Sequence, residues 1–373
     1  EELDTSKEIA IFTNELETAE SIEESVEAYL ESDSFNEKRK FNKELEKKWE
    51  RFPETKGKPG KYKDHFYDAI FPEDFKCDYP PMLYKESEKS YSEMMEKLGY
   101  KLHEFSFHAV SSQTACVNLF LPLLESKYAN EILRDLCAAK HLSTDFKEIN
   151  REAEGFCKGF RFEFWDEGKS GKKGYLNDHT PAAGTDADIA IVYKNSKGEN
   201  CIWLIEHKLT EAEFTTCGGY KSEHNAHKDV CSKCNPFCNE VAQKRCRYSV
   251  IGYNYWETTN DHKAQFSEKV PEMSQCPFKS GMNQLWRNQL LALKLKENRF
   301  DNAFFSVVYH SENESLEKKL KSYAPLFSKD AAFSAFTSKD LFECAQKYST
   351  DLSDWLKWYD EMYLSLDSES VDK

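Results

Sequence analysis

Residues 184–193 read GTDADIAIVY, and residues 201–211 read CIWLIEHKLTE. Both stretches are largely apolar, and the polar, glycine-containing segment 194–200 separates them. This pattern predicts two β-strands, 186–193 and 201–209, joined as an antiparallel hairpin. The near-continuous apolar character of the strands indicates that the hairpin is buried in a core.

The charged side chains of this hairpin gather at its open end. The register that closes the seven-residue turn 194–200 places Asp188 opposite Glu206 and Asp186 opposite Lys208. Side chains alternate along a strand, so these four are expected on one face. Two facing carboxylates repel each other, and a divalent cation between them removes the conflict. Carboxylate oxygens suit Mg²⁺ or Mn²⁺, so the hairpin predicts a metal site.

The predicted metal ligands are Asp188, Glu206 and the backbone carbonyl of His207, which lies between the two charged side chains of its strand. Lys208 is expected beside the metal, where it can contact a scissile phosphate or orient a water. A metal-bound water is a much better nucleophile than bulk water, and the cation offsets charge that develops on phosphorus. The competing interpretation is that these are ordinary exposed surface residues, because acidic residues and a Glu-x-Lys pattern are common at the ends of strands.

Helices and strands alternate along the rest of the chain, which predicts an α/β (α+β) fold. Helices are expected over 8–31, 35–50, 86–98, from Ser111 or Ser112 to Pro122, 127–140 and 281–297, and again near the C-terminus. Strands are expected over 160–165 and 303–309, and residues 61–85 are expected to be mostly irregular.

Three further blocks, together with the hairpin, resemble one known family. Ser111-Ser112-Gln113 is followed by Asn118-Leu119-Phe120 and Pro122-Leu123. The helix near 281–297 contains Gln284-Leu285-Trp286-Arg287-Asn288. With Asp188 and the Glu206-x-Lys208-x-Thr-Glu block, these are similar to a bacterial restriction-endonuclease-like group of the PD-(D/E)XK nuclease superfamily. Asn283 departs from the Tyr that precedes the Gln in that group. The resemblance covers about residues 105–325.

The resemblance implies a mixed central sheet flanked by helices, with the active site where two strands diverge. It implies Asp188 and Glu206 as metal ligands and Lys208 as the catalytic lysine, with Asp186 as an assisting acid. Many members add an upstream Glu, for which Glu163 and Glu154 both remain candidates. Gln284 is a candidate to reach the site from the late helix, or to pack as a polar helix position.

Six cysteines fall between residues 217 and 276, within an insertion expected at about 211–280. They are Cys217, Cys231, Cys234, Cys238, Cys246 and Cys276. The Cys231-x2-Cys234 step is typical of metal chelation, so structural zinc is the first expectation, with His224 and His227 nearby. An iron–sulfur cluster and unliganded buried thiols are the alternatives. Lysines, arginines and tyrosines interleave with these cysteines, so the insertion is expected either to grip DNA or to be a solvated loop.

Charge is unevenly distributed in this chain of net charge −15. Residues 1–37 carry thirteen acids and one base, residues 351–373 carry seven acids and two bases, and the body between them is therefore +2. A near-neutral body argues against strong non-specific DNA binding through the overall field. No apolar run approaches the roughly eighteen residues of a membrane helix. The start lacks the features of a signal peptide, which predicts a cytoplasmic protein.

These observations predict an acidic helical segment (1–60), a nuclease domain (61–350) and an acidic C-terminal helix or tail (351–373). The expected function is a Mg²⁺-dependent DNA endonuclease, in restriction or phage defence, with DNA as partner and a homodimer as an open option. The alternatives are a catalytically inactive nucleic-acid- or protein-binding module on the same fold, and an RNA or repair nuclease.

Overall fold

The computed structural model describes residues 60–62, 65–67, 70–72, 79–99, 106, 108–166, 173–180, 184–328 and 331–365. The helices predicted over 8–31 and 35–50 lie outside these residues. Within the described residues, no helix is both long enough and apolar enough to cross a membrane.

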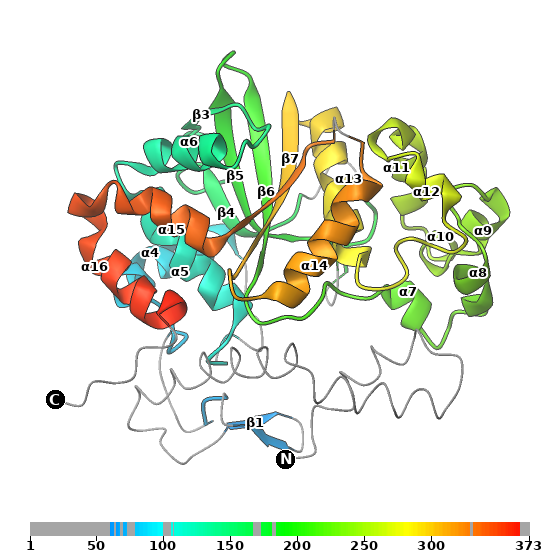
Figure 1. Cartoon of the computed structure of the whole chain (residues 1–373), viewed down its shortest axis with the longest axis horizontal. Coiled ribbons are helices and arrows are strands. Elements are labelled where there is room, and N and C mark those ends of the chain that lie inside the picture. Colours follow the sequence, from blue (N-terminus) through cyan, green and yellow to red (C-terminus); the bar gives the residue numbers. More distant parts are fainter. Residues whose placement is uncertain are drawn as a thin grey trace.

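A central sheet of mixed direction organises the fold (Figure 1). Its strand order is β3-β5-β6-β7-β8, and β4 also pairs with β5. The β5–β6 hairpin is antiparallel, whereas β6–β7 and β7–β8 are parallel. The strands are β3 (Phe146–Ile149), β4 (Phe160–Phe164), β5 (Ala187–Asn195), β6 (Asn200–Lys208), β7 (Asn302–Tyr309) and β8 (Phe333–Thr337).

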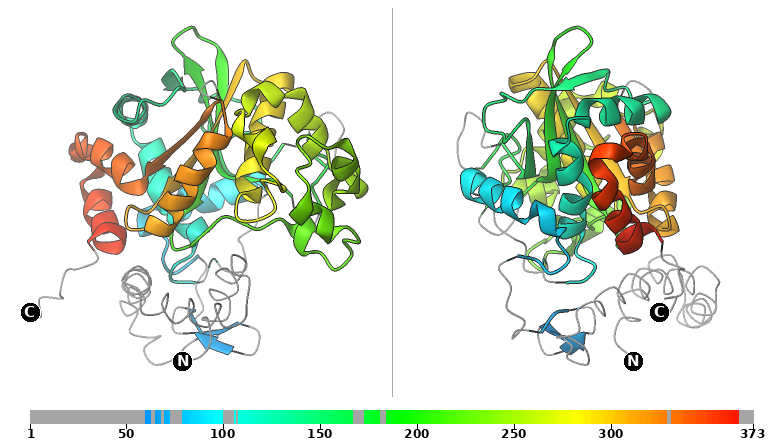
Figure 2. Two further views of the ribbon diagram at one scale, coloured as in Figure 1. Left: turned by 45° about the vertical axis from the view of Figure 1, so that its right-hand side comes forward. Right: turned by 90° about the vertical axis from the view of Figure 1, so that its left-hand side faces the viewer.

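Helices cover both faces of the sheet, as the views in Figures 1 and 2 show. One layer contains α4 (Glu88–Leu98), α5 (Ser112–Glu125), α6 (Ala129–Ala139), α15 (Ser338–Gln346) and α16 (Ser349–Tyr359), with η4 (Lys85–Ser87) before α4 and the π-helical turn η7 (Asp360–Leu364) after α16. The opposite layer contains α13 (Asn283–Asn298), α14 (Glu314–Tyr323) and η6 (Ala324–Leu326).

The side chains of the β5–β6 hairpin alternate between two hydrophobic cores, one on each face of the sheet. Ile189 and Ile191 belong to the core on the α5 side, and Ala190 and Val192 belong to the core on the α13 side. Because each strand is buried on both faces, its sequence is almost continuously apolar. The predicted mixed sheet with helices on both sides is confirmed.

Helix α5 runs past Pro122 to Glu125, so the prediction that it ends at Pro122 is wrong. A proline has no N–H, and the carbonyl of Asn118 four residues earlier therefore loses its helical partner. The indole of Trp355 in α16 donates to this carbonyl at 2.8 Å. This long-range contact satisfies the carbonyl and lets the helix continue. The N-terminus of α5 is as predicted, with the Ser111 hydroxyl accepting from Thr114 N.

The insertion folds into short helices beside α13 (Figure 1). They are α7 (Gly218–Lys221), α8 (Lys228–Lys233), α9 (Glu240–Arg245), α10 (Arg247–Val250), α11 (Tyr255–Asp261), η5 (Lys263–Gln265) and α12 (Lys269–Glu272). Four strands were not predicted: β3, β8 and the small antiparallel pair β1 (Gly60–Tyr62) and β2 (His65–Tyr67), which lies in a region expected to be irregular. Helix α16 packs in the same core as α5, although its residues were assigned to a terminal segment.

Candidate active site

The candidate site lies where β5 separates from β6. The two strands pair from Lys194–Asn200 to Ile189–Ile205, which confirms the predicted register. Strand β6 continues beside β7 as far as Lys208, while its ladder with β5 stops before Asp188. Asp188 instead turns its carboxylate to the backbone of β6, and Oδ2 accepts from His207 N at 2.6 Å. Two diverging strands thus bring Asp188 and Glu206 to one place.

Glu206 is almost completely buried and is held by three donors. Gln284 Nε2 donates to Oε1 at 2.6 Å, and Asn288 Nδ2 donates to Oε2 at 2.7 Å. Lys208 Nζ lies 2.9 Å from Oε1. Gln284 of α13 therefore contacts Glu206 directly. Asn288 has no role in the sequence-based prediction, although it stands one helical turn after Gln284 on the same side of the helix.

Lys208 is the cation of the site. It contacts Glu206 and lies 3.8 Å from Glu211. Burial alone lowers the pKa of Lys208, but the carboxylates of Glu206, Glu211 and Asp188 raise it by more, so that the net shift is upward. The lysine consequently stays charged at neutral pH.

Glu163 supplies a third carboxylate from β4. It lies between the pairs Phe162–Ile189 and Phe164–Ala187, and therefore opposite Asp188. Its φ of +48° is unusual for a residue with a side chain and marks a local irregularity in the strand. Burial raises the pKa of Glu163 to about 7, a hydrogen bond from Gln113 opposes the shift, and the charges of Asp186 and Glu206 add to it. The other upstream candidate, Glu154, is exposed.

The carbonyl of His207 faces α5. Ser112 Oγ donates to this carbonyl at 2.9 Å and lies 3.2 Å from Nδ1 of the same histidine. Burial and, next, the charge of Lys208 together lower the pKa of His207 to about 3, so the ring is neutral. The sequence indicates Ser112 only as an alternative start of the helix and Gln113 only as part of the resembling block. In the structure both lie at the start of α5, where Ser112 contacts His207 of β6 and Gln113 hydrogen-bonds Glu163.

Asp186 lies before β5 and not opposite Lys208. Its Oδ1 is 3.0 Å from Nε2 of His179, whose ring stacks on Trp165 with centroids 3.7 Å apart. The alternation rule does not extend to Asp186 because the residue is outside the strand. Asp186 nevertheless contributes to the electrostatic environment of Glu163.

A buried polar network holds the loop that leads into Asp188. The carboxylate of Asp178 accepts from Tyr255 at 2.7 Å and from the hydroxyl of Thr185. Arg287, one residue before Asn288 in α13, donates to Gly184 O at 3.3 Å. Helix α13 therefore contacts both halves of the site: Gln284 and Asn288 hold Glu206, and Arg287 holds the segment before Asp188.

The charges of the site are unbalanced. Among the described residues, the half-buried Glu163 and Asp188 and the buried Glu206 lie close to the cation Lys208. Burial is the largest cause that raises the pKa of Asp188 well above its ordinary value, and Glu206 is the next. Like charges in a low-dielectric region favour either proton uptake or a bound cation. The oxygen donors present are of the kind that Mg²⁺ prefers.

Comparison with protein families matches residues 27–364 to a family described as restriction endonuclease associating with ARP. The chain belongs to this family. The match spans the β5–β6 hairpin, α5, α13 and the insertion, so the mixed sheet is of the restriction-endonuclease-like class. No curated protein and no solved structure gives a match.

The cysteines of this restriction-endonuclease-like chain are free thiols in the described residues. Cys217 and Cys231 are buried, Cys234, Cys246 and Cys276 are partly exposed, and Cys238 is exposed. Among the described side chains, no group of three or more His, Cys, Asp or Glu is arranged to hold a metal ion. The predicted magnesium site has two carboxylates and a backbone carbonyl, and so does not require such a group.

Proposed function

We propose that the chain is a magnesium-dependent nuclease of the PD-(D/E)XK superfamily that hydrolyses phosphodiester bonds in DNA. The observation that carries this proposal is the grouping of the half-buried Glu163 and Asp188 and the buried Glu206 around Lys208. A fold gains no stability from three mutually repelling carboxylates in one place, and their cost is explained if the site binds a cation and positions a reaction.

Asp188, Glu206 and the His207 carbonyl would hold Mg²⁺ or Mn²⁺, which supplies an activated water and offsets negative charge on the phosphate. Lys208 is placed to contact the scissile phosphate or orient the water, because its amine lies beside Glu206. Glu163 lies opposite Asp188 and can act as a further acid of the site. Asp186 is a candidate for an assisting acid in the same site.

The ligands are already engaged by neighbouring donors. Both oxygens of Glu206 accept amide hydrogen bonds, and one also contacts Lys208. Metal binding therefore requires Glu206 to share or exchange one of these contacts. Gln284 and Asn288 then act as positioning residues, because they fix the carboxylate before the ion arrives.

DNA is the proposed substrate because the family is named for restriction endonucleases, which fits a role in restriction or phage defence. The same name indicates association with ARP, which we propose for this chain too. A catalytically inactive binding module on the same fold is the second candidate. The pairing of Lys208 with Glu206 favours the enzyme, because an inactive module has no need of a buried catalytic pair.

The test is cleavage of methylated and unmethylated plasmid and of single-stranded RNA by the full chain. Each reaction is run with Mg²⁺, Mn²⁺ or EDTA. We expect metal-dependent DNA cleavage that is lost in Asp188→Asn and Glu206→Gln. Glu154→Gln is the matched control, because Glu154 is an exposed upstream acid. Cleavage in EDTA, or full activity of Asp188→Asn, contradicts the proposal. DNA binding without cleavage indicates the inactive module, and cleavage confined to RNA indicates the RNA nuclease.

A further inference from the structure

Four cysteines of the insertion come from four separate segments. Cys217 is the N-cap residue of α7, Cys231 lies within α8, Cys246 joins α9 to α10, and Cys276 lies in the connection between α12 and α13. The segments are up to about sixty residues apart in sequence, since Cys217 and Cys276 are separated by 59 positions. Only tertiary packing can bring their thiols together.

Three contacts link these four segments to one another. Cys276 N donates to Cys231 O at 3.1 Å, so the α8 segment lies directly beside the connection to α13. Cys217 N donates to Lys279 O at 3.1 Å, three residues beyond Cys276. A Cβ at Gly219 would lie 3.3 Å from the Cβ of Arg247, so the start of α7 also touches the residue after Cys246. Each of the four segments therefore contacts another member of the set.

Hydrogen-bond donors point at two of the sulfurs. The backbone N–H of Tyr220 donates to Cys217 Sγ at 3.3 Å, and Tyr248 contacts the same thiol. The backbone N–H of Phe278 is directed at the Cys276 thiol. Donors of this kind favour the thiolate, which is the form that binds metals. Fixed N–H groups around sulfur are also what a metal–thiolate site uses to orient its ligands.

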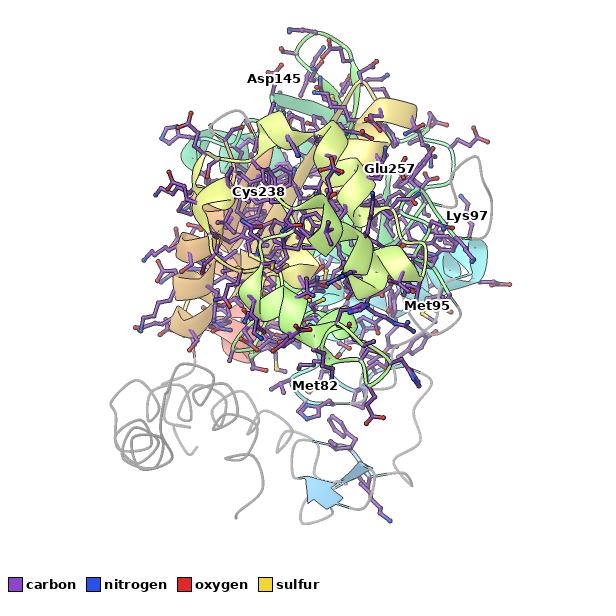
Figure 3. The ribbon with its side chains drawn as sticks, turned by 90° about the vertical axis from the view of Figure 1, so that its right-hand side faces the viewer. Met82, Met95, Lys97, Asp145, Cys238 and Glu257 are labelled. Carbon is purple, nitrogen blue, oxygen red and sulfur yellow. The ribbon has the colours of Figure 1, made fainter. Side chains whose placement is uncertain are left out.

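The remaining cysteines of the insertion lie differently. Cys238 is exposed on the face shown in Figure 3, and its thiol contacts Pro271 O at 3.5 Å. Cys234 caps the end of α8, where the chain becomes extended. Of the two nearby histidines, His224 is exposed and His227 is half-buried. The Cys231-x2-Cys234 step, which is the strongest sequence signal, thus supplies only one member of the converging set.

We propose that Cys217, Cys231, Cys246 and Cys276 form a structural site for a thiolate-bound metal centre, either a single zinc ion or an iron–sulfur cluster. This site is separate from the nuclease site and does not depend on nuclease activity. Four thiolates are a complete ligand set for structural zinc, and the same set binds iron–sulfur clusters. Cys234 and Cys238 are not ligands in this assignment.

The metal would stabilise a region that has little regular structure of its own. The helices α7 to α12 have four to seven residues each, too short to be stable in isolation. The sulfurs are not arranged as a closed coordination shell, and metal binding is expected to draw them together.

The experiment uses the full chain, purified without chelator and analysed for zinc, iron and visible absorbance. We expect about one zinc per chain, or iron with absorbance near 400 nm if the centre is a cluster. Removal of the metal with a strong chelator should expose four additional thiols to a thiol reagent. Cys231→Ser and Cys276→Ser should lose the metal, and the matched controls Cys234→Ser and Cys238→Ser should retain it.

Three results would overturn the assignment. The first is folded protein with neither zinc nor iron, whose thiol reactivity does not change when zinc is added. The second is loss of metal in Cys234→Ser or Cys238→Ser. The third is retention in Cys231→Ser and Cys276→Ser. If the serine variants do not fold, the metal content of the unmodified chain and the number of thiols that the chelator exposes in it still decide whether the metal centre exists. Asp188→Asn should keep the metal, which separates this site from the proposed magnesium site.

Discussion

Lys208 is the positive charge in contact with the buried Glu206, and its removal has two consequences. Lys208→Ala should abolish cleavage, because the proposed contact with phosphate or water is lost. Without metal it should also destabilise the fold by about 3 kcal/mol, since Glu206 and Asp188 lose their buried counter-charge. Mg²⁺ should recover most of this stability. Thermal melting with and without Mg²⁺, beside a cleavage assay, measures both effects.

Lys197→Ala is the control for Lys208, because Lys197 is exposed at the turn of the same hairpin. It should change neither cleavage nor melting. Wild-type activity in Lys208→Ala would remove this lysine from the proposed machinery.

His310 links the end of β7 to η7 and is expected to make the fold sensitive to acid. Its Nε2 lies 2.5 Å from Tyr363 O, and its Nδ1 accepts from Glu312 N at 3.1 Å. Burial lowers the pKa of His310 to about 4. Because the unfolded chain takes up the proton first, stability should fall as pH drops from about 6.5 toward 4.

The predicted contribution of His310 is about 2 kcal/mol between pH 7 and pH 5. Urea denaturation at the two pH values should show a smaller loss for His310→Gln than for the unaltered chain. His141→Gln, at an exposed position, should leave the difference unchanged. If His310→Gln loses as much stability between pH 7 and pH 5 as the unaltered chain, this histidine does not cause the acid sensitivity.

Helix α13 is expected to tune the site through Asn288. Asn288→Ala removes one of the two amide donors to Glu206 and leaves Gln284 and Lys208 in place. Loss of a residue that orients a metal ligand typically costs about 10–100-fold in activity or metal affinity. We therefore expect cleavage to fall in this range and the Mg²⁺ concentration for half-maximal rate to change, while the fold persists. Lys296→Ala, exposed near the end of α13, is the control. An unchanged metal dependence would contradict the positioning role.

The contact between α13 and the loop before β5 includes two charged residues, Arg287 of α13 and the buried Asp178. Arg287→Met should leave Asp178 buried without its nearby cation and destabilise the chain by about 3–5 kcal/mol. Asp178→Asn in the same chain should restore part of that loss, because the unpaired charge disappears. A double-mutant cycle by chemical denaturation measures the coupling. Strictly additive losses would mean that Arg287 and Asp178 do not stabilise each other.

Charge across the entire chain leads to a prediction about DNA affinity. Deleting residues 1–37 removes −12 of the net −15. Non-specific DNA binding should become tighter, because less negative charge repels the phosphate backbone. The difference between the full and shortened chains should shrink with added salt, since screening weakens the repulsion. Fluorescence anisotropy with a short duplex tests this; equal affinities at low salt would exclude shielding by the segment.

Much of the central architecture follows from local pattern. Period-two alternation and the length of the turn are sufficient for the β5–β6 register, and the apolar stretch at 303–309 is sufficient for β7. The serine before α5 is sufficient for the start of that helix. These features depend on neighbours in sequence, so they can be read before any packing is known. The same register indicates that Asp188 approaches Glu206, although the β5–β6 ladder itself ends at Ile189 and Ile205.

Other features depend on contacts between distant segments, which local pattern does not contain. Helix α5 passes Pro122 because Trp355, more than two hundred residues later, binds the freed carbonyl. Glu163 rather than Glu154 reaches the site because its backbone takes a left-handed conformation opposite Asp188. Asn288 gains its role when α13 packs over Glu206. The four cysteines of the proposed metal centre likewise lie in segments that only the folding of the insertion brings together, which the spacing of Cys231 and Cys234 does not show.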